Sequence, residues 1–371
     1  MKIIIAPDSY KGSLSAMQAA LCIKRAAVSV FGSSCQYVVM PVSDGGEGFV
    51  DICSTTCDGR VINIRVTGPL DTPVDAKYMI LSDGSCVIEM AQASGLTLVK
   101  PNQRNPLYTT TYGVGELIKD ALDKNVRRFI IGLGGSATND GGTGALSALG
   151  AVFKDENHVA LRACGLNLGK ISSIDLTNFD KRIHESEFIL ACDVDIPLFG
   201  EKGTTLLYSP QKGADMEMSY YLEAGMKHFA GLYNGKYATN PGAGAAGGVG
   251  FGLMAYCGAK KESGIDVMLD ILGFESELKD ATLVITGEGK IDFQSAQGKV
   301  LSGIGKSASA WNVPVIAFGG IVEAEESCLH KMGIESAYEI RGNHTTQYAM
   351  DNAKNLLETR VEEVLRTGEW R

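Results

Sequence analysis

The chain has 371 residues, a length typical of two domains, and 45% of them are apolar, enough for a large buried core. Its net charge of −9 disfavours a general binding surface for nucleic acid or anionic membranes, because like charges repel. The nine cysteines have no paired metal-binding spacing, and the N-terminal segment lacks the apolar stretch of a secretory signal. We therefore expect a cytoplasmic globular protein that binds neither nucleic acid nor membrane.

Short runs rich in Val and Ile alternate with helical patterns at both ends of the chain. Residues 2–7 form the first such run, the pattern at 14–31 is helical, and a second run follows at 36–42. Near the other end, runs at 281–289 and 313–320 enclose a helical pattern, and an amphipathic helix closes the chain. This alternation is typical of strands that are buried on both faces of a mainly parallel sheet.

The middle of the chain begins with a different pattern of predicted elements. Residues 60–90 alternate apolar and polar side chains between turn signals, which predicts an antiparallel meander. Strands are expected at 127–133 and 187–194, after a helical pattern at 108–124. The uncharged segment 242–259 is too rich in glycine to favour a membrane, so we expect it to be buried or to form a loop and a helix.

These patterns predict an α/β protein with two α/β domains. The first is expected to combine residues 1–60 with residues 281–371 around a parallel sheet. The second, residues 61–280, is expected to be inserted between them and to contain a mixed sheet.

Five glycine-rich loops carry acidic or amide groups where strands are expected to end. They cover residues 6–16, 42–49, 132–150, 192–200 and 286–299. In open α/β sheets, ligands bind beyond the carboxyl ends of the strands. We therefore expect the five loops to converge on one crevice.

The stretch "GLGGSATNDGGTGALSALG" at 132–150 has the features of a loop that binds an anion. Glycine lets backbone N–H groups close around phosphate oxygens, and a following helix contributes its positive end. Donors are expected from a set of loop residues: Gly134, Gly135, Ser136, Thr138 and Asn139. Asp140 is expected either to cap the helix or to hold a metal. The alternative is a tight turn with an Asx cap.

Two further loops gather hard oxygen ligands and lysines. "SDGGEG" contains Asp44 and Glu47, for which the alternative is a pair of solvated turn acids. The second loop, "TGEGKIDFQSAQGK", offers five charged or amide side chains: Glu288, Lys290, Asp292, Gln297 and Lys299. Carboxylates clustered in this way suit Mg²⁺ better than zinc, and lysines suit phosphate.

The known motifs of three other enzyme classes are incomplete, out of context or absent in this sequence. "GIGKS" at 303–307 lacks the first glycine of a P-loop and has a helical pattern. "GAGAAG" at 242–247 follows no buried strand, which argues against a dinucleotide site. No G-x-S-x-G motif surrounds Ser136, so a serine hydrolase is disfavoured.

Taken together, the loop motifs resemble those of the bacterial glycerate kinases of the two-domain type that form 2-phosphoglycerate. The resemblance rests on "PDSYKGSLSA", "SDGGEGF", "GLGGSATNDGGTGALSALGA", "GAGAAGG" and "TGEGKIDFQSAQGK", with "TTYGVGELI" and "PQKGA" in addition. It implies an ATP- and Mg²⁺-dependent kinase of D-glycerate. It also implies a flavodoxin-like domain and a second α/β domain around a cleft. The family pattern has an asparagine before Pro197, where this chain has Ile196.

Residue chemistry and the resemblance together suggest roles for the loop residues. The candidates for magnesium coordination or for accepting the substrate proton are Asp44, Asp193, Glu288 and Asp292, with Asp44, Asp193 and Glu288 as metal ligands. Lys11 joins them as a catalytic candidate, and residues 134–140 are expected to hold the nucleotide phosphates. The candidates for binding the substrate are Ser9, Glu47, Lys290, Gln297 and Lys299.

Two other functions remain open from sequence. A non-catalytic α/β module could use the same loops to bind a sugar acid or a nucleotide, although so many carboxylates would repel an anion unless a metal intervenes. A kinase of another small hydroxy acid is the second alternative.

Overall fold

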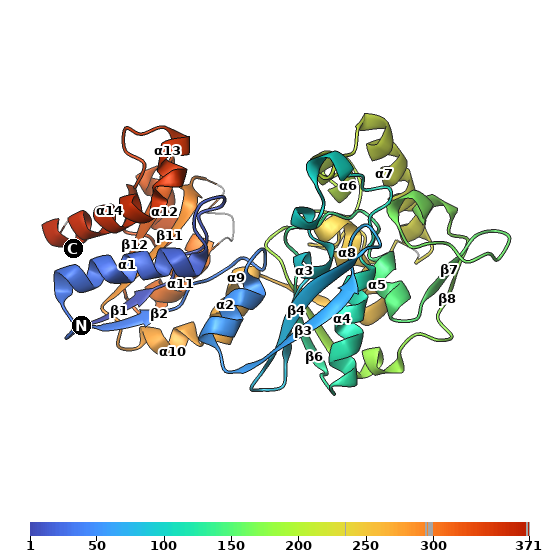
Figure 1. The fold of residues 1–371 in the computed structure, drawn as a ribbon, viewed down its shortest axis with the longest axis horizontal. Coiled ribbons are helices and arrows are strands. Elements are labelled where there is room, and N and C mark those ends of the chain that lie inside the picture. The colour runs from blue at the N-terminus through green and yellow to red at the C-terminus, as the bar shows by residue number, and fades with distance from the viewer. Residues whose placement is uncertain (234, 294, 296–299, 369, 371) are drawn as a thin grey trace. The chain divides into compact units, whose positions relative to one another are not determined.

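The computed structural model of the chain describes residues 1–371 except 234, 294, 296–299, 369 and 371. The chain folds into two compact units (Figure 1). The first unit contains Met1–Asp44, Asp51–Cys57 and Ser263–Arg371, and the second contains Gly45–Val50 and Asp58–Glu262. The first unit is therefore built from both ends of the chain.

The first unit contains a five-stranded sheet in which all neighbouring strands are parallel. In sheet order, the strands are β13 (Ser336–Glu339), β12 (Val315–Val322), β11 (Leu283–Ile291), β1 (Lys2–Ile5) and β2 (Gln36–Val39). Numbered by their succession in the chain, they have the order 2-1-3-4-5 of flavodoxin-like domains. The direction of succession reverses between β1 and β11, and in such sheets this switch point is where ligands bind.

Helices cover the first unit's sheet and bury its apolar strands. They are α1 (Ala16–Phe31), α9 (Gly264–Leu272), α10 (Phe274–Leu278), α11 (Val300–Ala310), α12 (Glu326–Lys331), α13 (Thr346–Asp351) and α14 (Ala353–Thr367), together with α2 (Phe49–Thr56), whose first two residues belong to the second unit. A capping box at Ser15 and Gln18 begins α1. Ile23 of α1 and Leu357 of α14 are fully buried in the same core as Ile3. The "GIGKS" stretch lies inside α11, so it does not form a P-loop.

The second unit contains a mixed six-stranded sheet. Its strands, in sheet order, are β10 (Lys260–Glu262), β9 (Glu187–Ala191), β6 (Arg128–Gly132), β5 (Cys86–Glu89), β4 (Pro73–Leu81) and β3 (Gly59–Thr67). From β10 to β5 the neighbours are parallel, whereas β3, β4 and β5 form the expected antiparallel meander. A separate hairpin pairs β7 (Val152–Lys154) with β8 (Ser173–Asp175).

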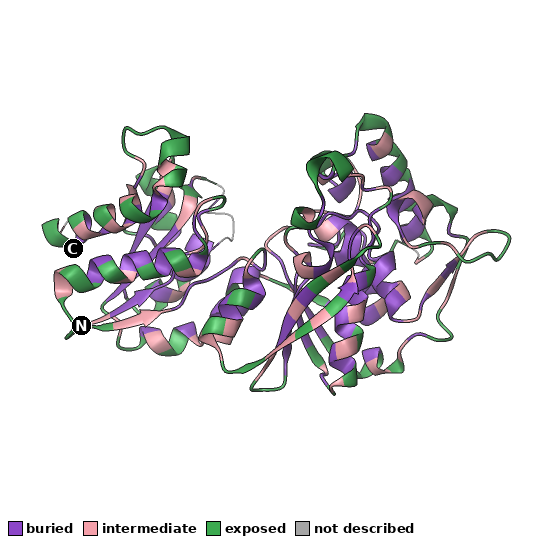
Figure 2. Cartoon of the chain, in the orientation of Figure 1, coloured by how far each residue is buried: buried purple, intermediate pink, exposed green. Residues whose placement is uncertain are grey.

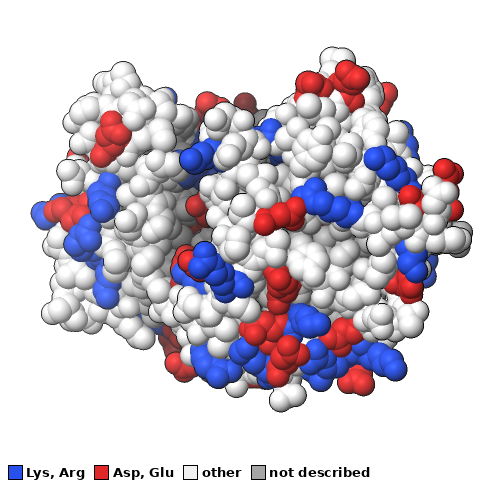
Figure 3. Space-filling view, turned by 45° about the vertical axis from the view of Figure 1, so that its right-hand side comes forward, with Lys and Arg blue, Asp and Glu red and all other residues white. Residues whose placement is uncertain are grey.

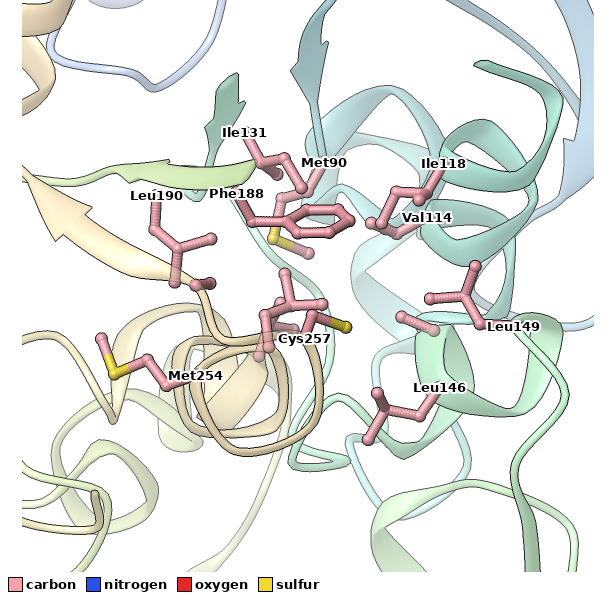
Figure 4. Close-up of a cluster of buried hydrophobic side chains, with 14 of the residues drawn as sticks. Met90, Val114, Ile118, Ile131, Leu146, Leu149, Phe188, Leu190, Met254 and Cys257 are labelled. Carbon is pink, nitrogen blue, oxygen red and sulfur yellow. The ribbon is translucent and has the colours of Figure 1, made fainter. Parts of the chain in front are cut away.

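The helices of the second unit enclose a large apolar core. They are α3 (Ala91–Ser94), α4 (Tyr112–Asp123), α5 (Thr143–Ala148), α6 (Thr204–Tyr208), α7 (Met216–Gly231) and α8 (Ala245–Cys257), with 3₁₀ turns η1 (Leu96–Leu98), η2 (Pro101–Gln103), η3 (Gly165–Lys170), η4 (Lys181–Glu185) and η5 (Pro210–Lys212). In Figure 4, Phe188 of β9 points toward Val114 and Ile118 of α4. All three side chains are fully or nearly fully buried.

The uncharged segment is part of this core. Val249, Phe251 and Leu253 of α8 are fully buried, which confirms the expectation of a buried segment. Among the residues described, the chain has no helix of the length and apolarity needed to cross a bilayer. Figure 2 shows buried residues along the strands and on the covered sides of the helices, while Figure 3 shows acidic and basic side chains intermingled on the face in view.

Candidate active site

A cavity of about 380 Å³ lies at the carboxyl edge of the first unit's parallel sheet. Its walls come from the loop after β1, from the end of β11 and from β12, so it lies at the switch point of the sheet. The charged and hydroxyl-bearing residues that line it are Asp8, Ser9, Tyr10, Lys11, Ser13, Asp44, Glu288, Lys290, Asp292, Ser295, Arg341 and Thr346. The cavity thus brings together residues from three of the five glycine-rich loops.

Four carboxylates line this cavity: Asp8, Asp44, Glu288 and Asp292. Burial and then the charge of Asp44 raise the pKa of Asp8 to about 7, and Glu288 adds to the effect. The backbone N–H of Ser9, which donates to Asp8 Oδ1 at 2.6 Å, opposes the shift. The negative charge is therefore concentrated enough to favour a bound cation or a shared proton.

Sequence reasoning missed Asp8. The signal was present, because Asp8 is the first acidic residue after the first predicted strand. Its side chain faces the same cavity as Asp44 because parallel strands β1 and β2 end at one edge of the sheet.

Hydrogen bonds fix the loops around the cavity. The hydroxyl of Tyr10 donates to the carbonyl oxygen of Phe318 at 2.7 Å, which ties the loop after β1 to β12. Ser295 Oγ donates to Glu288 Oε1 at 2.5 Å and accepts from the backbone N–H of Asp292 at 3.2 Å. Ser295 thereby links Glu288 of β11 to Asp292, which directly follows the strand.

The basic residues at the cavity differ in their pairing. Lys290 lies 2.9 Å from Glu323 and 3.4 Å from Asp292, and these contacts raise its pKa. Arg341 pairs with Glu339 at 3.1 Å. Lys11 is exposed and forms no ion pair within the described residues. Lys11 is thus the lining cation whose charge is most available to an anionic substrate.

Over the described residues, no group of three or more His, Cys, Asp and Glu side chains has the arrangement of a metal centre. This finding is compatible with magnesium, which usually keeps several waters and binds through one or two carboxylates and the substrate phosphates. Asp44 and Glu288 lie at one cavity and meet that requirement. Asp193 belongs to the second unit.

In the second unit, the glycines of two motifs allow loops to pack backbone against backbone. A Cβ on Gly132 would lie 2.4 Å from the carbonyl oxygen of Gly45, and one on Gly134 would lie 2.4 Å from Gly46 Cα. The N–H of Gly134 also donates to the oxygen of Gly45 at 3.4 Å. These glycines therefore have a packing role beside any role in binding phosphate.

Asp140 shapes the loop that follows β6. Its fully buried carboxylate accepts hydrogen bonds from the backbone N–H and the hydroxyl of Thr111 and from the N–H groups of Gly142 and Gly144. Burial raises the pKa of Asp140, and these hydrogen bonds oppose the shift. The N–H groups that begin α5 are therefore taken by Asp140, so an anion bound by this loop would contact residues 134–139 instead.

Several buried polar groups of this loop have no partner among the described residues. They include two side-chain atoms, Thr138 Oγ1 and Asn139 Oδ1. They also include the backbone N–H groups of Ser136, Thr138 and Asn139. Because buried polar groups are nearly always paired, such a concentration points to a ligand.

Lys212, in η5, is a buried cation beneath the same loop. Its Nζ donates to Ser136 Oγ at 2.8 Å and to the carbonyl oxygen of Thr138 at 2.7 Å. Burial lowers the pKa of Lys212 to about 7, and the charge of Asp140 opposes this shift. Sequence analysis noted its motif, "PQKGA", but assigned Lys212 no role.

The start of α8 supports the loop from another direction. Ala246, Gly247 and Gly248 all have positive φ, which makes a sharp turn at "GAGAAGG". The carbonyl oxygen of Gly247 accepts from Gly141 N–H at 3.0 Å, and a Cβ on Gly247 would lie 2.0 Å from the oxygen of Thr138. Glycine at 247 is therefore required by close packing.

The remaining predicted residues have different locations. Asp193 follows β9 and is half-buried, and Glu47 is exposed; both belong to the second unit. Gln297 and Lys299 lie outside the described residues. The structure thus gathers Ser9, Lys11, Asp44, Glu288, Lys290 and Asp292 at one cavity, and residues 134–140 with Lys212 in one loop region of the other unit. That the two groups act together stays a prediction.

Comparison with known proteins gives consistent matches over nearly the whole chain. Residues 3–369 match the model of the Glycerate kinase family. The chain is 46% identical to a glycerate kinase of Bacillus subtilis (strain 168), and 43% identical to a glycerate 2-kinase of Escherichia coli (strain K12); each match covers 92% of this chain and 90% of the relative. A crystal structure of a putative glycerate kinase 2 from Salmonella typhimurium LT2 superposes with a TM-score of 0.86 at 41% identity, and covers 100% of this chain and 98% of that one.

Proposed function

Because the chain belongs to the glycerate kinase family and is therefore a kinase, we propose that it transfers the terminal phosphoryl group of ATP to D-glycerate and forms 2-phosphoglycerate. The observation that carries the choice of product is the 43% identity, over 92% of this chain, to a relative named glycerate 2-kinase. We propose the cytoplasm as its location.

In this proposal, the cavity of the first unit takes D-glycerate. Lys11 binds the carboxylate or the transferred phosphoryl group, because its ammonium is exposed at the cavity. Lys290 and Lys299 are further candidates for that role, and Ser9, Glu47 and Gln297 for binding the substrate. The acceptor of the substrate hydroxyl proton is one of the acidic residues Asp8, Asp44, Asp193, Glu288 and Asp292.

Magnesium and the nucleotide complete the proposed site. Asp44 and Glu288 are the carboxylates that would hold the ion, with Asp193 as a third candidate; when bound, the ion neutralises charge on the phosphate oxygens. Residues 134–139 hold the phosphates through Ser136, Thr138, Asn139 and bare N–H groups. Unpaired buried donors in that loop support this role.

The test incubates the purified protein with ATP and MgCl₂ and a panel of D-glycerate, L-glycerate, glycolate and lactate. We expect ADP formation with D-glycerate, a ³¹P signal coupled to the proton on carbon 2, and loss of turnover in EDTA that magnesium restores. Phosphorylation at carbon 3 would contradict the proposed product, 2-phosphoglycerate. Turnover only with an acid other than D-glycerate would contradict the proposed substrate.

Absence of nucleotide consumption with every acid would favour the binding module. Family membership argues against that alternative, and the four carboxylates at one cavity argue against it independently, because they would repel an acid anion that binds without a metal ion.

A further inference from the structure

Lys212 is a buried charge that no step of the proposed reaction has used so far. Its side chain is 3% exposed, and Asp140 is the charged group that acts on it among the described residues. Burying an ammonium group is unfavourable unless it is compensated by hydrogen bonds. The two acceptors that compensate it, Ser136 Oγ and the carbonyl oxygen of Thr138, both belong to the loop with unpaired donors.

The contact with Ser136 determines what that hydroxyl can do. A serine hydroxyl has one proton to donate, and its oxygen accepts. In its protonated form Lys212 has only donors, so the Ser136 oxygen then accepts from it and the hydroxyl proton is left to point elsewhere. The second contact pulls the carbonyl oxygen of Thr138 toward the core, which turns the adjoining peptide N–H of Asn139 the other way.

We propose that Lys212 is a positioning residue that fixes the Ser136 hydroxyl as one hydrogen-bond donor, and the backbone N–H of Asn139 as a second, toward the phosphates of the nucleotide. This inference rests on the proposed function, because it concerns the same loop. Lys212 acts through Ser136 and Thr138 rather than by touching the ligand, since its ammonium is almost fully covered.

The test compares five variants with the wild type in steady-state assays with ATP and D-glycerate. Lys212→Met keeps the buried volume without the charge, Ser136→Ala removes the hydroxyl, and the double variant combines them. Lys181→Met is the matched control, because Lys181 is exposed in the same unit. We expect the KM for ATP to rise about tenfold or more in each single variant, as for loss of a charge-assisted hydrogen bond, with the KM for D-glycerate changed less than about twofold.

The double variant separates positioning from simple structural loss. If Lys212 acts through Ser136, removing both costs scarcely more than removing either, whereas independent roles would multiply the two effects. Lys212→Arg should not rescue, because a guanidinium group is planar and larger than the ammonium.

Three outcomes would overturn the inference about Lys212, and a fourth would overturn the proposed function. An unchanged KM for ATP in Ser136→Ala overturns the inference even if Lys212→Met fails to fold, and so do multiplicative effects in the double variant. Equal changes in both KM values would also overturn it, by indicating general damage. A wild-type protein that consumes no ATP would overturn the proposed function as well, which is a distinct result.

Discussion

The backbone N–H and the hydroxyl of Thr111 both donate a hydrogen bond to the same oxygen of Asp140, and each bond is 2.8 Å long. The two residues are 29 positions apart, so this contact joins the start of α4 to the loop after β6. Because the carboxylate is buried and also accepts from Gly142 and Gly144, it acts as a structural anchor of the loop.

Asp140→Ala should therefore lower stability. It leaves four donors in a dry environment, and we expect a loss of about 3 kcal/mol or more in the free energy of unfolding. Denaturant unfolding followed by circular dichroism measures this. Asp155→Ala is the control, because Asp155 accepts two backbone hydrogen bonds in an exposed turn. Similar losses in both variants would contradict the anchoring role.

Gly247→Ala should impair the proposed ATP binding by displacing residues 136–139. The new Cβ would lie 2.0 Å from the carbonyl oxygen of Thr138. The φ of Gly247 is +68°, a value that is unfavourable for alanine in any case. Gly84→Ala is the matched control, because φ there is +83° and a Cβ meets no atom within 4 Å. Titration calorimetry with MgATP should show affinity reduced about tenfold or more in the first variant only. An equal loss of ATP affinity in both variants would show that backbone strain, and not the contact with Thr138, causes the loss.

Sequence patterns predicted the elements well where the signal is local. Val and Ile runs predicted four of the five strands of the parallel sheet but not β13, whose sequence "SAYE" has no such run, and alternation with turns predicted the meander of β3, β4 and β5. The glycine-rich loops were also recognised, because their composition is unusual over a short window. The strand order, by contrast, depends on pairings such as β1 with β11, between segments about 280 residues apart.

Side-chain roles were harder to predict because they depend on distant partners. Lys212 meets Ser136 across 76 positions, and nothing near either residue in the sequence signals the contact. The raised pKa of Asp8 arises from burial and from Asp44 and Glu288, which come from other loops. Gly247 ends the "GAGAAG" stretch, for which the sequence argued against a dinucleotide site, and its packing against Thr138 shows why glycine is needed there.

Asp8→Asn should change how stability depends on pH. The folded protein holds the Asp8 proton up to a pH of about 7, whereas the unfolded chain releases it near its ordinary value of 3.8. As pH rises from 4 to 7, the unfolded state loses its proton first, so Asp8 makes the folded state progressively less stable. The cost above pH 7 is at most about 4 kcal/mol, and Asp8→Asn should remove it.

Thermal melts of metal-free protein between pH 4 and 8 measure this difference. Asp270→Asn, at an exposed position of the first unit, is the control and should follow the wild type. If the difference in melting temperature between Asp8→Asn and the wild type stays constant from pH 4 to 8, the pKa of Asp8 is not raised in the folded protein.

Lys11→Ala and Asp193→Asn should each reduce turnover by about 10²-fold or more, as expected for loss of an electrostatic or acid-base group. Lys11 is exposed and Asp193 is half-buried, so neither change should alter the fold. Steady-state rates with saturating ATP and D-glycerate, beside circular dichroism spectra, test both. A wild-type rate in either variant would remove that residue from the site.

Lys212→Met should abolish a gain in stability that the wild type shows in alkaline solution. The pKa of Lys212 is about 7 in the folded protein, below its ordinary value of 10.5, because the ammonium is buried. Between these values the unfolded state binds more protons, so the stability of the wild type rises with pH relative to the variant. Below pH 7 the charged form is buried at full cost, and the difference between the two proteins is constant. The free energy of unfolding in urea, measured at pH 6.5, 8 and 9.5, follows this trend, and Lys181→Met is the exposed control. If the free energies of the wild type and Lys212→Met differ by the same amount at all three pH values, Lys212 keeps its proton throughout.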